Sequence, residues 1–285
     1  MSRINTNVVS LVAQRNLGIS NTAVSKSLER LSTGLRINRG ADDPAGLIAS
    51  ERLRSEKVAL QTAISNNVRA VNLLGTAEGS LNEINALLLD IQALVAQAAN
   101  SGGITTEEVA ANQIQVDEAI NSITRISDTA QFNGKLLLDG SETFTFQIGA
   151  EINATNQVTV TIDDVSADQL GTTGLLNTLL TGGANELSVT ANLDTAATVV
   201  KESIDQIASL RGTIGAVQKN TLETSIRSLG TALENITSAE SAVRDTDFAA
   251  ETASLTRAQI LSQAGTSVLA MANAAPQNVL ALLGQ

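Results

Sequence analysis

The sequence contains no cysteine, histidine, tryptophan or tyrosine, and only four phenylalanines and two prolines. These absences exclude nucleophile systems that need histidine or cysteine, and they exclude zinc sites built on those ligands. Without cysteine no disulfide can form, so this clue does not indicate a redox compartment. The carboxylates show no calcium-loop spacing. We therefore expect no catalytic, cofactor-binding or metal site, and we expect that the protein is not an enzyme.

Long apolar runs are missing as well. No stretch reaches 18 uninterrupted apolar residues, so no membrane helix is predicted. No apolar block follows the first seven residues, so a cleaved secretory leader is not predicted.

Charge is unevenly spread along the chain. Six basic residues against Glu29 give residues 1–39 a net charge of +5, and three acidic residues against Arg257 give residues 245–285 a net charge of −2. Because the whole chain carries −11, residues 40–244 carry −14. An acidic middle argues against nucleic acid, whose phosphates require a basic face.

Helical periodicity is what the sequence has in abundance. Between residues 53 and 98, apolar residues recur at spacings of three and four, with Asn67 and Glu78 in two of the seam positions: Leu60, Ile64, Val71, Leu74, Leu81, Ile84, Leu88, Ile91, Val95 and Ala98. The pattern predicts a helix roughly 70 Å long with one apolar stripe. Such a helix needs partner helices of similar length.

The same rhythm predicts the partners. It recurs over residues 109–130 after the glycine pair 102–103, and again over residues 193–243. Residues 143–148 and 158–162 instead alternate with period two, which indicates a β-hairpin, and the Gly-rich segment 163–192 is expected to be irregular surface structure. The predicted fold class is mainly α, with long antiparallel helices in a coiled-coil bundle and a small β-hairpin region.

Both ends of the chain are predicted to be helices with thin apolar stripes, over residues 4–35 and 245–285. A helix of this kind is marginal alone in water and gains stability by packing on neighbours. Contacts between unlike faces of identical copies build an open helical polymer. We therefore interpret the stripes as a self-assembly interface made of Ile4, Val8, Leu11, Leu17, Val24, Leu28, Leu31, Leu35, Leu261, Val268, Met271, Ala275, Val279 and Leu282.

A joint is predicted between the first helix and the long helix. In residues 31–46, LSTGLRINRGADDPAG, the glycines permit a break, and Asp42 or Asp43 can cap a new helix that has Pro44 in its first turn. Arg36 and Arg39 lie within this joint.

This stretch resembles the signature of bacterial flagellin, the subunit of the flagellar filament. Further matches to that family are RINTN at 3–7, NNVR at 66–69, LNEIN at 81–85, QFNG at 131–134, AAETASLTRA at 249–258 and ANAAPQNVL at 272–280. Each fragment is modestly specific, and their common order makes the set highly specific. Flagellins often carry a large variable outer domain, and this chain has little room for one between residues 143 and 192.

The resemblance implies that the chain is a secreted, extracellular filament subunit. In the filament, identical copies of the chain surround each subunit. It implies that residues 1–42 and 245–285 form the inner tube as N- and C-terminal core helices. It also implies that residues 43–192, the long helices with the β region, and residues 193–244, the return helix, form the outer tube. Export through the flagellar secretion channel, a secretion chaperone and a filament cap are implied as well.

The sequence differs from many flagellins in a motif that a vertebrate Toll-like receptor recognises. Counted back from QAAN at 97–100, the position of its arginine is Asp90 here. Leu94 matches the motif, whereas the acidic position on the next helix is Gln115. A charge reversal in such an interface is costly, so we expect weak recognition by that receptor. Alternatively, Asp90 is an ordinary solvated residue of a bacterium that meets no vertebrate.

Two other functions fit parts of the pattern. The hook–filament junction protein has similar end helices, although the C-terminal match favours the filament subunit. A chemoreceptor signalling hairpin also has long heptads, but it would lack the β region and the apolar ends.

Overall fold

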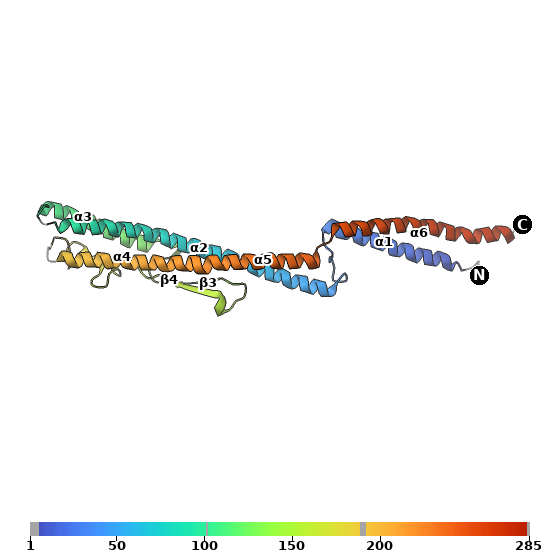
Figure 1. Cartoon of the computed structure of the whole chain (residues 1–285), viewed down its shortest axis with the longest axis horizontal. Coiled ribbons are helices and arrows are strands. Elements are labelled where there is room, and N and C mark those ends of the chain that lie inside the picture. The colour runs from blue at the N-terminus through green and yellow to red at the C-terminus, as the bar shows by residue number, and fades with distance from the viewer. Residues whose placement is uncertain (1–5, 101, 189–191, 284–285) are drawn as a thin grey trace. The chain divides into compact units, whose positions relative to one another are not determined.

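The computed structural model describes residues 6–100, 102–188 and 192–283, with side chains through residue 274. The chain divides into two compact units. The terminal unit contains residues 1–57 and 234–285, and the central unit contains residues 58–233. Helices dominate both units, and in the central unit α2, α3 and α4 run side by side with a β-hairpin on their flank (Figure 1). The predicted fold class is confirmed.

Helix α2 (Pro44–Ala98) carries the apolar seam that the periodicity predicts. Asn67 and most of the predicted apolar positions are fully buried, while Ile64, Val71 and Glu78 are half-buried. The seam is wider than predicted because small residues beside it are buried too, namely Ala63, Ala70 and Ala77.

The partner helices are α3 (Thr106–Thr129) and α4 (Leu193–Ala216). Thr105 and Glu108 form a reciprocal capping box that starts α3 after the glycine turn. Val116, Ile120 and Ile123 of α3, together with Val199, Val200 and Ile207 of α4, join the seam of α2 in one core.

A π-helical turn, η4 (Val217–Leu222), interrupts the return helix and separates α4 from α5 (Glu223–Arg244). The apolar rhythm explains it, because Val217 and Leu222 are five residues apart instead of three or four. A π turn absorbs the extra residue and returns the stripe to the core side, where Leu222 is buried. The prediction of one uninterrupted helix over residues 193–243 missed this turn.

The β region contains two small antiparallel sheets. Strands β1 (Gln131–Phe132) and β2 (Lys135–Leu136) flank the turn at 133–134. Strands β3 (Thr143–Gln147) and β4 (Gln157–Thr161) form the predicted hairpin, and a short 3₁₀ turn, η1 (Ala154–Asn156), lies in its loop. Phe144 pairs with Val160, and both side chains are buried.

The prediction that residues 163–192 are surface structure is wrong for much of the described part. Buried apolar side chains from this segment enter the core, namely Val165, Ala167, Leu170, Leu176, Leu179 and Leu187.

A helix carboxylate holds the backbone that connects these residues. Glu202 of α4 accepts hydrogen bonds from the amides of Thr172 (2.8 Å) and Thr173 (2.7 Å). The hydroxyl and amide of Thr173, followed by the Thr172 amide, lower the pKa of Glu202 to about 2. The segment, including η2 (Leu176–Leu179), is therefore a cover of the central core.

Helices α1 (Val8–Thr33) and α6 (Phe248–Leu283) belong to the terminal unit and lie side by side (Figure 1). Asn7 caps α1 by accepting a hydrogen bond from the Ser10 amide (3.0 Å). Gly34 ends α1 in the left-handed conformation, with φ of 73°, which glycine adopts without steric cost. Asp247 starts α6 by accepting a hydrogen bond from the Ala249 amide (2.9 Å).

A pair of neighbouring leucines tests the seam. Leu88 is 0% exposed, whereas Leu89 on the same helix is 48% exposed. We expect Leu88→Ala to lower the free energy of unfolding by about 2–5 kcal/mol, because it leaves a cavity. The control Leu89→Ala should change it by less than about 0.5 kcal/mol. Urea unfolding followed by circular dichroism measures both, and equal effects would contradict the placement of the seam.

Candidate self-assembly interface

The most buried positions of the paired helices α1 and α6 are small residues. Buried positions along it are Ser10, Ala13, Ser27, Ala258 and Ala272. Gly265 of α6 faces Leu17, and a Cβ added at Gly265 would lie 3.4 Å from the Leu17 Cδ1 atom, in ordinary van der Waals contact. Small side chains at a helix contact let the two axes approach.

Hydrogen bonds link the two helices along this contact. The Asn7 amide group donates to the carbonyl of Ala272 (2.7 Å), and the Ser10 hydroxyl donates to Asn273 Oδ1 (2.8 Å). Further along, the Ser262 hydroxyl donates to Asn21 Oδ1 (2.8 Å). These bonds fix the lengthwise position of one helix against the other without burying bulky side chains.

Large apolar side chains of both helices consequently stay outside. Among the predicted interface residues, Leu11 is 58% exposed and Met271 is 64% exposed. The other exposed residues of this predicted set are Val8, Leu28, Leu261 and Val268. Single exposed apolar residues are common on any protein, but a gathering of them along a helix pair marks a surface for a partner.

The remaining predicted interface residues have different positions. Leu17, Val24, Leu31 and Leu35 are half-buried, so they contribute part of their surface to packing within the chain. Ile4 and the side chains of Ala275, Val279 and Leu282 lie outside the described residues.

Sequence periodicity missed several exposed apolar residues of the same helices, namely Val9, Val12, Ile19, Phe248 and Ile260. The predicted stripes did not include them, although Val12 lies four residues after Val8. Composition could have indicated them, because α1 carries more large apolar residues than one stripe can hold.

The joint is built by hydrogen bonds between the two chain segments that cross it. The amide of Arg36 donates to the carbonyl of Arg244 (2.7 Å), and the amide of Thr246 donates to the carbonyl of Gly34 (2.9 Å). The Arg36 guanidinium also donates to the carbonyl of Val243 (2.5 Å). The segment that follows α1 is therefore hydrogen-bonded to the segment that precedes α6.

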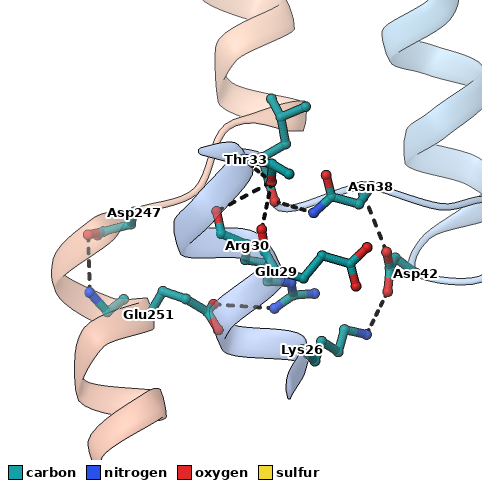
Figure 2. A network of polar contacts seen from close by, with 10 residues as sticks. Lys26, Glu29, Arg30, Thr33, Asn38, Asp42, Asp247 and Glu251 are labelled. Carbon is teal, nitrogen blue, oxygen red and sulfur yellow. Dashed lines mark hydrogen bonds and ion pairs between the residues drawn. The ribbon is translucent and has the colours of Figure 1, made fainter. Parts of the chain in front are cut away.

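Asp42 organises the loop that follows (Figure 2). Its carboxylate accepts hydrogen bonds from the amides of Asn38 (3.3 Å) and Arg39 (3.1 Å), and it pairs with the ammonium of Lys26 on α1 (2.8 Å). The Lys26 hydrogen bond and the Arg39 amide lower the pKa of Asp42 to about 2. Arg39 in turn pairs with Glu29 (3.0 Å).

The neighbouring positions have separate tasks. Asp43 caps α2 by accepting from the Gly46 amide (2.9 Å), and Pro44 is the first residue of that helix. Ile37, which no sequence pattern singled out, is 1% exposed and anchors the loop. A third ion pair, Arg30 with Glu251 (3.3 Å), joins the end of α1 to the start of α6 (Figure 2).

The three receptor-motif positions lie together in the central unit. Asp90, Leu94 and Gln115 line one shallow groove between α2 and α3, beside Leu87 and Glu118. Asp90 and Gln115 are exposed, and Leu94 is half-buried.

No group of three or more acidic residues in the described parts of the chain is arranged to hold a metal ion. Among the helices that the structure describes, none is both long and apolar enough to span a membrane.

These features define a class: an α-helical structural protein whose chain ends pair through small residues and keep large apolar side chains outside. Comparison with known proteins agrees. Residues 4–143 match the bacterial flagellin N-terminal helical region, and residues 197–283 match the bacterial flagellin C-terminal helical region.

Individual relatives cover nearly the whole chain. A flagellin of Bacillus subtilis (strain 168) is 41% identical over 99% of this chain and 99% of its own length. A flagellin of Halalkalibacterium halodurans is 37% identical over 98% of this chain and 99% of its own length. The fold is similar to a Vibrio parahaemolyticus structure assigned to the flagellar hook-associated proteins, with a TM-score of 0.61, 14% identity, 72% of this chain and 100% of the other covered.

The chain therefore belongs to the bacterial flagellin family. It is a structural subunit of the extracellular flagellar filament, in a short form without a large outer domain.

Acid titration tests the joint. The folded-state pKa of Asp42, about 2, is below its ordinary value of 3.8. Its stabilising contribution is therefore present above pH 3.8 and is lost as the pH falls through about 2. We expect the amide resonances of Asn38 and Arg39 to titrate with a midpoint near 2, and Asp42→Asn to abolish that titration. A midpoint near 3.8 would contradict the described hydrogen bonds.

Proposed function

We propose that the exposed apolar residues of α1 and α6 are the surface through which copies of this chain pack in the filament. The observation that carries this proposal is the small-residue contact between the two helices, which leaves Leu11, Leu28, Leu261 and Met271 in water. Burial of apolar surface stabilises by about 25 cal/mol per Å². Several neighbours together can therefore offset the entropy of ordering the chain ends.

The same proposal assigns places in the filament. Residues 1–42 and 245–285 form the inner tube, and residues 43–192 and 193–244 form the outer tube. The support is the difference in burial: the central unit encloses a core of large apolar side chains, whereas the terminal helices expose theirs. The proposed role involves no chemical step and no cofactor.

We also propose that a secretion chaperone binds the subunit before assembly and that a cap protein receives it at the growing end. The exposed apolar ends support both partners, because such surfaces associate nonspecifically unless a partner covers them.

Assembly of a charge variant tests the interface. We expect Leu11→Glu to leave the helix content unchanged, because Leu11 is exposed in the single chain. In the filament it would bury a carboxylate, so the critical concentration for seeded polymerisation should rise by about tenfold or more. Sedimentation after seeding measures this.

The matched control is Ile152→Glu in the hairpin loop, at a side chain that is 91% exposed. It should polymerise like the unchanged chain. Normal filaments from Leu11→Glu would show that this part of α1 is not buried by neighbours.

The groove between α2 and α3 leads to a separate proposal, that a vertebrate Toll-like receptor is activated weakly. The acidic side chains of Asp90 and Glu118 line it together, so a receptor surface suited to an arginine would meet repulsion.

We expect Asp90→Arg to increase the response of reporter cells to purified monomer by about tenfold or more. Gln92→Arg is the control, because it adds a positive charge at an exposed position that does not line the groove. Nanomolar activation by the unchanged chain would refute the proposal.

A further inference from the structure

A buried asparagine interrupts the apolar seam of α2. Asn67 is 0% exposed, and it lies at a seam position between Ile64 and Val71. Leu or Ile fills most of the comparable positions of this helix. A polar side chain at such a position lowers stability, and in coiled coils it selects one arrangement over another at that cost.

The amide nitrogen of Asn67 reaches the β-hairpin. It donates to the carbonyl of Ala63 on its own helix (2.8 Å) and to the carbonyl of Ile148, next to the end of β3 (2.9 Å). The hydroxyl of Ser225 on α5 donates to the same Ile148 carbonyl (3.1 Å). One backbone oxygen of the hairpin thus receives hydrogen bonds from two helices.

Ile148 is firmly attached to the rest of the hairpin. Its amide donates to the carbonyl of Asn156 (2.8 Å), across the loop. The adjacent Gln147 side chain donates to the carbonyls of Gly149 (3.0 Å) and Glu151 (2.6 Å). Holding the Ile148 carbonyl therefore holds the loop and both strands.

The apolar face of the hairpin does not by itself select one position. The inward residues repeat every second position, as Phe144 and Phe146 on β3 and as Val158 and Val160 on β4. A shift by two residues, about 7 Å, would present the same kind of face to the helices. The buried residues at the base of the hairpin, Leu138 and Ile162, limit such a shift at one end, and a directional contact at the loop end distinguishes the two positions there.

Asn67 is also imperfectly satisfied. Its Oδ1 atom is buried and has no hydrogen-bond partner among the described residues. An unpaired buried acceptor costs stability, so an apolar residue of similar size would pack there at least as well. Because Asn67 lowers stability, a purely stabilising role does not explain its presence in the seam.

We propose that Asn67, assisted by Ser225, is the residue that fixes the docking position of the β3–β4 hairpin on the helices of the central unit. The hydrophobic faces provide the attraction, and the Ile148 carbonyl provides the reference point.

The absence of cysteine from the chain makes a direct test possible. Spin labels on Thr145→Cys of β3 and Thr76→Cys of α2, both exposed positions, report the hairpin–helix distance by pulsed electron resonance in the full chain. With Asn67 and Ser225 unchanged, one narrow distance distribution is expected. Asn67→Leu should retain or raise the midpoint of urea unfolding, and it should add a second distance population shifted by up to about 7 Å.

Two further variants complete the test. Ser225→Ala removes one of the two donors and should give a smaller second population, and it remains informative if Asn67→Leu does not fold. Glu78→Leu replaces the other polar seam residue, which makes no hydrogen bond to the described part of the hairpin, and should leave one population. A single unshifted distribution in Asn67→Leu, or in Ser225→Ala if the former is unfolded, would overturn the proposal.

Discussion

The close approach of α1 and α6 is the constraint on which the terminal unit depends. Small side chains at a helix contact let the two axes approach, and Ala13, Ala258 and Gly265 contribute small surfaces here. Leu17 packs against Gly265 within this contact, whereas Leu11 and Met271 stay exposed beside it. The contact that pairs the chain ends is therefore also what leaves them incompletely buried.

The central unit follows the opposite arrangement. The leucine and isoleucine residues of the α2 seam are enclosed by α3, α4, the hairpin and the 163–188 cover. Its polar contacts mostly define positions: Glu202 holds a loop by its backbone amides, and Asn67 holds the hairpin by one carbonyl. A subunit with one closed core and one open helix pair can fold by itself and still require neighbours.

Much of this was predictable from local pattern. The seam from Leu81 to Ala98, the hairpin at residues 143–161 and the cap at Asp43 each follow from spacing or turn chemistry. The π turn at 217–222 and the burial of Leu176 and Leu187 were not predicted. A five-residue gap in a rhythm looks like a weak seam position, and isolated leucines among glycines show no period.

Spacing and composition alone were enough to establish that the chain forms long helices and that its ends carry apolar residues. Which of those residues are used within the chain depends on how the helices pack. Leu17 turns toward Gly265 and Leu11 remains in water, although both belong to the predicted self-assembly interface. That division depends on the rotation of α1 about its axis against α6, which the partner helix sets and no pattern within α1 contains.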